Sequence, residues 1–142
     1  MIQQHSISIR SNGRSTINLT SELERLVDAS AIEQGLCHVF VQHTSASLII
    51  TENADADVRH DLETFLSRLV VDGDPAFRHD QEGDDDMAAH IRSVLTQSET
   101  TIPIQAARLA LGSWQGVYLW EHRYQAHKRD ILVTLIGDNN QY

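Results

Sequence analysis

The sequence has few cysteines, few basic residues and no long apolar run, and each shortage excludes a class of protein. Cys37 is the only cysteine among 142 residues, which excludes an internal disulfide and a thiolate metal cluster. The chain has 11 Lys and Arg against 20 Asp and Glu, and its formal charge of −9 argues against general binding to nucleic acids or anionic membranes. No window approaches the roughly 18 apolar residues of a membrane span. We therefore expect neither a nucleic-acid nor a membrane partner.

The first residues, Met1–His5, show neither a basic leader nor an apolar segment, and we expect a cytoplasmic protein. The length fits one domain, residues 1–142, and the 41% of hydrophobic residues is typical of a globular chain. Cys37 lies in an apolar run and is expected to be a buried core residue. A small anionic ligand remains compatible with this acidic chain, because a local positive cluster can oppose the overall charge.

Strand-like and helix-like apolar patterns follow one another along the chain. Asn12-Gly13 is typical of a hairpin turn between the first two strands, and Ser21 with Glu24 matches a helix capping box. Helical spacing predicts helices near 20–31, 55–69 and 85–96, with a polar loop at 72–83 between the last two. Strands are predicted at 2–10, 15–18, 36–43, 45–52, 100–104, 108–111, 114–123 and 128–136. We expect an α+β fold with about three helices and a mostly antiparallel, sandwich-like core.

Three histidines occupy comparable places in these elements. His43 and His122 each stand last on the apolar face of a predicted strand, because side chains alternate along a strand. His90 lies in the third helix, four residues after Asp86, so these two side chains share one helix face. A polar residue at the rim of an apolar face often lines a cleft. The pattern therefore makes these three histidines candidate ligands of one site.

Three imidazoles with an open fourth position suit zinc or a similar divalent ion. Asp86, Glu52 and Glu121 are candidate orienting groups or ligands for such a site. Spacing alone leaves the alternative that each histidine is an ordinary hydrogen-bonded residue, since no H-x-x-x-H motif is present. The other histidines are expected to be ordinary residues: His5, His38, His60, His79 and His127.

Hydroxyl and guanidinium groups near these histidines suggest contacts to an anion. Ser45 and Ser47 follow His43, but neighbouring residues of an extended strand point apart, so the sequence does not define a nucleophile–base pair. No G-x-S-x-G context surrounds either serine. Their hydroxyls more simply bind phosphate oxygens or stabilise a turn. Arg123 is a candidate source of positive charge, with a surface ion pair as the alternative.

Five sequence blocks occur in an order that closely resembles the YjbQ family, also called the secondary thiamine-phosphate synthase family. The blocks are HTSASL (43–48), ENAD (52–55), GDDDMAAHI (83–91), TIPI (101–104) and LALGSWQGVYLWEHR (109–123). The resemblance implies an α+β subunit with a β-sandwich-like core that assembles as a homotrimer. It also implies a pocket that holds His43, His90 and His122 with acidic neighbours. Ala88 stands where the family commonly has proline, and Trp120 where it commonly has cysteine.

The activity that the resemblance implies is a weak coupling of a pyrimidine pyrophosphate to a thiazole phosphate, giving thiamine phosphate and pyrophosphate. Our first hypothesis is accordingly a metal-dependent transferase that binds a small phosphorylated molecule, with zinc as the expected ion and magnesium as an alternative. Metal-dependent hydrolysis of a phosphoester or amide is the second hypothesis, and a non-catalytic trimeric metabolite-binding protein is the third. The candidate residues are His43, His90 and His122 for the metal, Asp86, Glu121 and His43 for catalysis, and Ser45, Ser47, Asn53 and Arg123 for the substrate.

Overall fold

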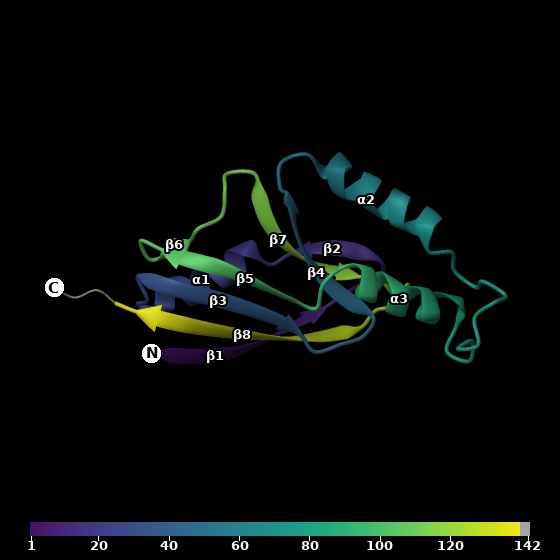
Figure 1. The fold of residues 1–142 in the computed structure, drawn as a ribbon, viewed down its shortest axis with the longest axis horizontal. Helices are drawn as coiled ribbons and strands as arrows, with labels where there is room; N and C mark the ends of the chain where they lie inside the picture. The colour runs from purple at the N-terminus through teal and green to yellow at the C-terminus, as the bar shows by residue number, and fades with distance from the viewer. Residues whose placement is uncertain (140–142) are drawn as a thin grey trace.

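Antiparallel pairing arranges the strands in two sheets in the computed structural model, which describes residues 1–139 (Figure 1). The larger sheet has the order β1-β8-β3-β5-β6, and the smaller has the order β2-β7-β4. The elements are β1 (Ile2–Arg10), β2 (Ser15–Asn18), α1 (Thr20–Ser30), β3 (Gln34–Val41), β4 (Ala46–Glu52), α2 (Ala56–Leu69), α3 (Asp84–Leu95), β5 (Glu99–Gln105), β6 (Arg108–Leu109), β7 (Gln115–Glu121) and β8 (Lys128–Asp138). The α+β class and the three helices are confirmed.

The main core lies where the inner faces of the two sheets and α1 meet. β3 and β8 contribute Val39 and Val133, β4 and β7 contribute Leu48 and Leu119, and all four side chains are fully buried. Cys37 belongs to this core as expected, and burial raises the pKa of its thiol to about 12. The alternation of buried and exposed positions along β8 follows from the period of two in a strand with one covered face.

A second, smaller apolar cluster covers the other face of the three-stranded sheet. Trp120 of β7 packs there with Leu66 of α2, Ala88 of α3 and Val70. Figure 1 shows both helices on this side, joined by a long loop that extends beyond the sheets. The loop ends meet, because the N–H of Gly73 donates to the carbonyl of Asp84, 2.9 Å away. This closure holds the loop residues near the first turn of α3.

The turn at Asn12-Gly13 does not form the predicted hairpin. β1 pairs with β8 and β2 pairs with β7, so the chain passes from one sheet to the other at this turn. Gly13 has a φ of 112°, and a Cβ there would lie 2.6 Å from the carbonyl oxygen of Tyr124. The turn signal in the sequence is therefore correct, but close approach to the loop after β7 separates the two strands.

The predicted capping box of α1 is also wrong. The N-cap is Leu19, which is buried and has no side-chain capping bond. The N–H of Thr20 instead donates to the side-chain oxygen of Asn18, 2.9 Å away. Helix α1 therefore begins at Thr20, with the buried Leu19 as its N-cap in place of Ser21. At α2 the N-cap is Asp55, whose side chain accepts from the N–H of Asp57. Among the described helices, none is long and apolar enough to cross a membrane.

The hairpin between β5 and β6 contains two strained alanines, and this gives a first prediction. Ala106 and Ala107 have φ of 50° and 64°, the left-handed values that a two-residue hairpin loop requires and that alanine tolerates poorly. The double substitution Ala106→Asn with Ala107→Gly should stabilise the fold by about 1–2 kcal/mol, because asparagine and glycine adopt these values more readily. Thermal unfolding followed by circular dichroism should show a midpoint a few degrees higher.

The matched control is Ala56→Gly, at an exposed position in the first turn of α2. Glycine there should lower the midpoint, because it adds backbone freedom to the unfolded chain at a residue with an ordinary helical conformation. An unchanged or lower midpoint for the hairpin variant would contradict the strain at residues 106–107.

Candidate functional site

His122 lies just after β7 and is fully buried. Its Nδ1 accepts a hydrogen bond from Nε of Arg92 at 3.0 Å, and its Nε2 lies 2.8 Å from Oγ of Ser47. Arginine only donates, so the ring hydrogen must be on Nε2, which then donates to Ser47. Burial, followed by the charges of Arg92, Arg14 and Arg129, lowers the pKa of His122 to about 2. In this arrangement neither nitrogen has a free lone pair for a metal ion.

The same contacts bear on the interpretation of Ser47 as a nucleophile. A histidine that activates a serine must accept the hydroxyl hydrogen. Here Nε2 of His122 already carries a hydrogen, so it donates to the Ser47 oxygen instead. His122 is thus a neutral structural residue between α3 and β4.

His43 lies in the loop of residues 42–45, between β3 and β4. Its Nε2 accepts a hydrogen bond from the backbone N–H of Asp130 at 2.7 Å. Burial, together with the charge of Arg129, lowers the pKa of His43. The neutral ring therefore carries its hydrogen on Nδ1. His43 is in this structure a hydrogen-bond acceptor through Nε2, and its role as a metal ligand stays a prediction.

His90 has the opposite arrangement of donors and acceptors. Its Nδ1 lies 3.0 Å from the carbonyl oxygen of Thr44 and donates to it, because a carbonyl only accepts. Its Nε2 lies 3.1 Å from Oδ2 of Asp86, one helical turn earlier. An imidazole whose Nδ1–H is held by a backbone carbonyl presents Nε2 as a ligand, as metal-bound histidines do.

His79, which the sequence suggested to be ordinary, also reaches Asp86. Its Nε2 lies 2.6 Å from Oδ2 of Asp86, and its ring packs edge-on against that of His90 with centroids 5.3 Å apart. The ligand atoms of His79, Asp86 and His90 all lie within 4.8 Å of one another. Within residues 1–139 this is the group with the donor set and spacing of a metal site, and it includes neither His43 nor His122.

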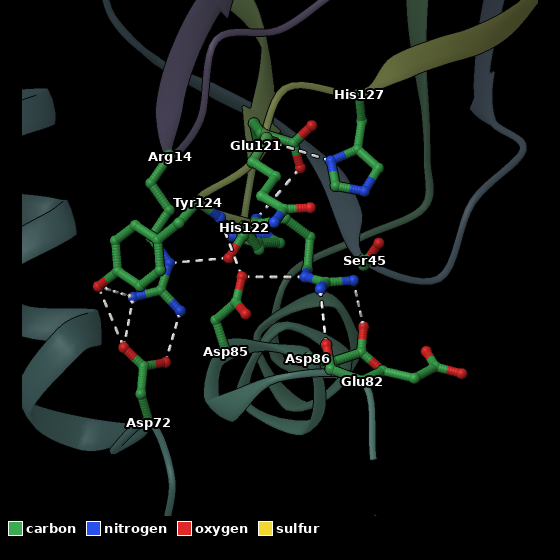
Figure 2. A network of polar contacts seen from close by, with 12 residues as sticks. Arg14, Ser45, Asp72, Glu82, Asp85, Asp86, Glu121, His122, Tyr124 and His127 are labelled. Carbon is green, nitrogen blue, oxygen red and sulfur yellow. Dashed lines mark hydrogen bonds and ion pairs between the residues drawn. The ribbon is translucent and has the colours of Figure 1, made fainter. Parts of the chain in front are cut away.

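Arg123 holds the first turn of α3 from the opposite side. Its Nη1 donates to Oδ1 of Asp86 at 2.7 Å, its Nε to Asp85 at 2.9 Å and its Nη2 to the carbonyl of Glu82 at 3.0 Å. Figure 2 shows Asp85, Asp86 and Glu82 converging on this group. Only 2% of Asp86 is exposed. Burial by itself would raise the pKa of Asp86, but the hydrogen bond to His79 and the charge of Arg123 hold that pKa below its usual value.

Glu121, a candidate catalytic residue from sequence, is fully buried between the sheets. It receives hydrogen bonds from Nε of Arg129 at 2.8 Å, from the hydroxyl of Ser11 at 2.6 Å and from the N–H of Arg123 at 3.2 Å. Burial would raise the pKa of Glu121, but the bonds from Arg129 and Ser11 lower it overall. Its carboxylate oxygens are all occupied inside the protein.

The structure does not bring the four predicted substrate residues together. Ser45 accepts from Arg129, Ser47 accepts from His122, and Arg123 is occupied by Asp85 and Asp86. Asn53 lies after the far end of β4, where its amide donates to the carbonyls of residues 113 and 115. Sequence neighbours of the histidines thus serve mainly to hold loops in place.

Two cavities border the cluster of His79, Asp86 and His90. His90 lines a cavity of about 290 Å³ together with His43, Thr44, Ser93, Val94 and Ser98. His79 lines a smaller one, of about 160 Å³, formed by the loop before α3. The cluster therefore lies at the surface of α3, reachable by a small ligand on either side.

These observations define a class of protein: a two-sheet α+β domain with a His–Asp–His cluster at the start of a helix that covers the smaller sheet. The chain belongs to the UPF0047 family, since residues 5–138 match the model of the "UPF0047 protein YjbQ-like" family. UPF0047 protein sll1880 of Synechocystis is 50% identical over 95% of this chain and 92% of its own length. UPF0047 protein YjbQ of Escherichia coli is 40% identical over 97% of this chain and 100% of its own.

Solved structures agree with this assignment. A YjbQ/UPF0047-family protein of Clostridium acetobutylicum matches 94% of this chain and 99% of its own, with a TM-score of 0.83 and 33% identity. A YbjQ-like protein of Sulfolobus solfataricus matches 97% of this chain and all of its own, with a TM-score of 0.85 and 22% identity. The latter likeness shows the fold alone. The family predicted from the five sequence blocks is confirmed.

The buried, neutral state of His122 gives a second prediction. In the unfolded chain this histidine has a pKa near 6.5, whereas in the fold its pKa is about 2. Below pH 6.5 the unfolded state therefore binds a proton that the folded state does not, and stability falls as pH falls. The amide introduced by His122→Gln can still accept from Arg92 and donate to Ser47. Between pH 6.5 and pH 5 the free energy of unfolding of this variant should fall by about 2 kcal/mol less than that of the native chain.

Urea unfolding at the two pH values measures this difference. His60→Gln is the control, because His60 is exposed on α2 and its replacement should leave the pH dependence unchanged. If the free energy of unfolding falls equally for the native chain and for His122→Gln between the two pH values, His122 takes up a proton in the folded state.

Proposed function

We propose that this protein binds a divalent metal ion, zinc by the nature of the ligands, through Nε2 of His79, Oδ2 of Asp86 and Nε2 of His90. The observation that carries the proposal is the geometry of His90, whose Nδ1–H is held by the carbonyl of Thr44 while Nε2 faces the other two ligand atoms. These three atoms are close together, and their lone pairs repel one another unless a proton or a cation lies between them. The cluster is thus built to hold a positive charge.

The donor set also favours one kind of ion. Two imidazoles and one carboxylate suit zinc and related metals, whereas magnesium prefers oxygen ligands. Arg123 holds the second oxygen of Asp86, which fixes the orientation of the carboxylate. Three protein ligands leave a fourth position, which is the arrangement of catalytic rather than structural zinc sites. The ion would supply Lewis-acid chemistry toward an oxygen of a phosphate, a carbonyl or water.

The activity that we propose for this site is the transfer implied by the family resemblance, a weak synthesis of thiamine phosphate from its pyrimidine pyrophosphate and thiazole phosphate precursors. A metal ion would give this acidic chain a local positive charge for a phosphorylated ligand. His43 lines the cavity beside His90, and its Nδ1–H can donate to an oxygen of such a ligand. Asp86 holds His79 and His90 in place.

Hydrolysis of a single phosphoester or amide is a second candidate, and one observation favours it. The transfer reaction has two phosphorylated substrates, but Arg123, Arg129 and Arg92 already pair with carboxylates around the site. A hydrolase would have to neutralise only one substrate. The assay below therefore includes both reactions.

Zinc binding tests the proposed site, and this is our third prediction. Protein purified without added metal and titrated with zinc should bind one ion per chain. His79→Ala, Asp86→Asn and His90→Ala should each weaken binding at least about 100-fold, because each removes a direct ligand. His43→Ala and His122→Gln should retain binding within a few-fold, and His60→Ala serves as the surface control. Loss of zinc in His43→Ala and His122→Gln but not in His79→Ala would instead favour the three-histidine site predicted from sequence.

The same variants test the reaction. Zinc-loaded native protein should form thiamine phosphate from the two precursors, and Asp86→Asn should reduce its formation to background. A parallel panel of phosphomonoesters and amides detects hydrolysis. Ligand binding without turnover in either assay would identify a binding protein and contradict both catalytic proposals.

We also propose the homotrimer that the family resemblance implies, and a row of exposed apolar side chains supports it. Ile2, Ile136 and Leu36 are neighbours on the outer face of the larger sheet and are 69%, 45% and 46% exposed. Phe40 lies on the same face. Contiguous apolar surface of this kind commonly marks a protein contact.

Self-association through this face is our fourth prediction. The native chain should have the mass of three copies by light scattering, and Leu36→Lys with Ile136→Lys should reduce it to one, because charges would then be buried at the contact. Leu69→Lys on α2, also an exposed apolar position, is the control and should remain trimeric. A trimer that survives the sheet variant but not the control would place the contact on α2.

A further inference from the structure

The loop of residues 42–45 is held at every position by a hydrogen bond to another element. The N–H of Gln42 donates to the carbonyl of Asp130 at 3.1 Å, and the N–H of Asp130 donates to His43 at 2.7 Å. The carbonyl of Thr44 accepts from His90, and the carbonyl of Ser45 accepts from the N–H of His122 at 3.3 Å. This short loop therefore sets the position of His43 itself and of the Thr44 carbonyl that binds His90.

Arg129 of β8 anchors this loop from inside the protein. Its Nη2 donates to the carbonyl and to the hydroxyl of Ser45, at 3.1 and 3.0 Å, and its guanidinium also binds both oxygens of Glu121. Arg129 is 3% exposed and Glu121 is fully buried. A planar guanidinium can bridge a carboxylate and a carbonyl at the same time, whereas a lysine ammonium is a single point charge.

A buried ion pair of this kind gives little net stability compared with apolar residues of the same size, so stability alone is a weak reason for it. Its position suggests a different role. Arg129 lies next to Asp130, whose N–H binds His43, and it holds Ser45, which is next to the Thr44 carbonyl that binds His90. The buried pair thus lies one residue away from each of the two backbone groups, the Asp130 N–H and the Thr44 carbonyl, that select which ring nitrogen carries the hydrogen.

We propose that Glu121 and Arg129 are positioning residues: through the loop of residues 42–45 they hold His43 and His90 with the hydrogen on Nδ1, and so orient Nε2 of His90 toward Asp86 and His79. The part that concerns metal affinity rests on the function proposed above. The part that concerns the two ring hydrogens does not, because it can be measured in metal-free protein.

The test uses a paired variant, Glu121→Gln with Arg129→Met, which removes both charges together and leaves no buried ion unpaired. The glutamine side chain introduced by Glu121→Gln can still accept from Ser11 or from the N–H of Arg123, which favours folding. Arg129→Lys is the conservative variant. Arg59→Gln is the matched control, since Arg59 is a half-buried arginine that donates to the carbonyl of Glu52 and stacks on Tyr118, away from the loop.

Two measurements are made on each protein. Long-range nitrogen–proton NMR of the histidine rings, without metal, reports which nitrogen carries the hydrogen. Native protein and Arg59→Gln should show Nδ1–H at both His43 and His90. The paired variant should show a mixture of Nδ1–H and Nε2–H at both residues, and Arg129→Lys should be intermediate. Zinc titration should give an affinity about 10-fold weaker in the paired variant and unchanged in Arg59→Gln, a typical effect of losing an outer-shell partner.

The outcomes separate this inference from the proposed function. Altered ring hydrogens in the paired variant support the inference even if native protein binds no zinc, a result that would refute only the metal site. Unchanged ring hydrogens in a folded paired variant would overturn the inference. A zinc affinity of the paired variant that is no weaker than that of Arg59→Gln would also overturn it. If the paired variant does not fold, Ser45→Ala, which removes only the hydroxyl contact with Arg129, should shift the same NMR signals to a smaller extent, and no shift would overturn the inference.

Discussion

The buried carboxylate of Asp86 is the group on which the rest of this site depends. A carboxylate with 2% exposure is costly unless its oxygens are paired. Arg123 satisfies one oxygen, and His79 and His90 lie against the other. These partners come from the loop before α3, from α3 itself and from the loop after β7. Burial of one charge therefore ties three separate segments together at the edge of the smaller sheet.

The histidines of this chain are distinguished by their hydrogen-bond partners. Arg92 donates to His122 and the N–H of Asp130 donates to His43, so each of these rings has its free lone pair occupied. At His90 the carbonyl of Thr44 accepts the hydrogen of Nδ1, which leaves the lone pair of Nε2 available. Residues of the same type at similar strand or helix ends thus become a buried structural residue, an acceptor held by the backbone and a candidate ligand. The identity of the neighbouring group decides among these roles.

Three arginines near the site share one feature, which is that each is paired with a carboxylate. The chain is acidic overall, yet these three are paired: buried Arg92 with Glu63, buried Arg129 with Glu121 and partly buried Arg123 with Asp85 and Asp86. Burial lowers the pKa of His122 and of His43, and the charge of Arg129 adds to this at both residues, as that of Arg92 does at His122. Each of the three arginines is already paired with a carboxylate and is a poor candidate for binding an anionic ligand directly. A cation on the His–Asp–His cluster would supply the positive charge that such a ligand needs.

The sequence by itself determined the elements, the α+β class and the family, because apolar periodicity and the five ordered blocks are local properties of the chain. It also identified Asp86 and His90, which one helical turn brings together. It did not identify His79, which lies in an irregular loop without periodicity. The one available signal was the pair Gly73 and Gly83, which flanks a loop that returns to the first turn of α3. Only the tertiary structure decided which ring nitrogens are free, because residues far away in the sequence, Arg92, Asp130 and Thr44, supply the hydrogen bonds that fix them.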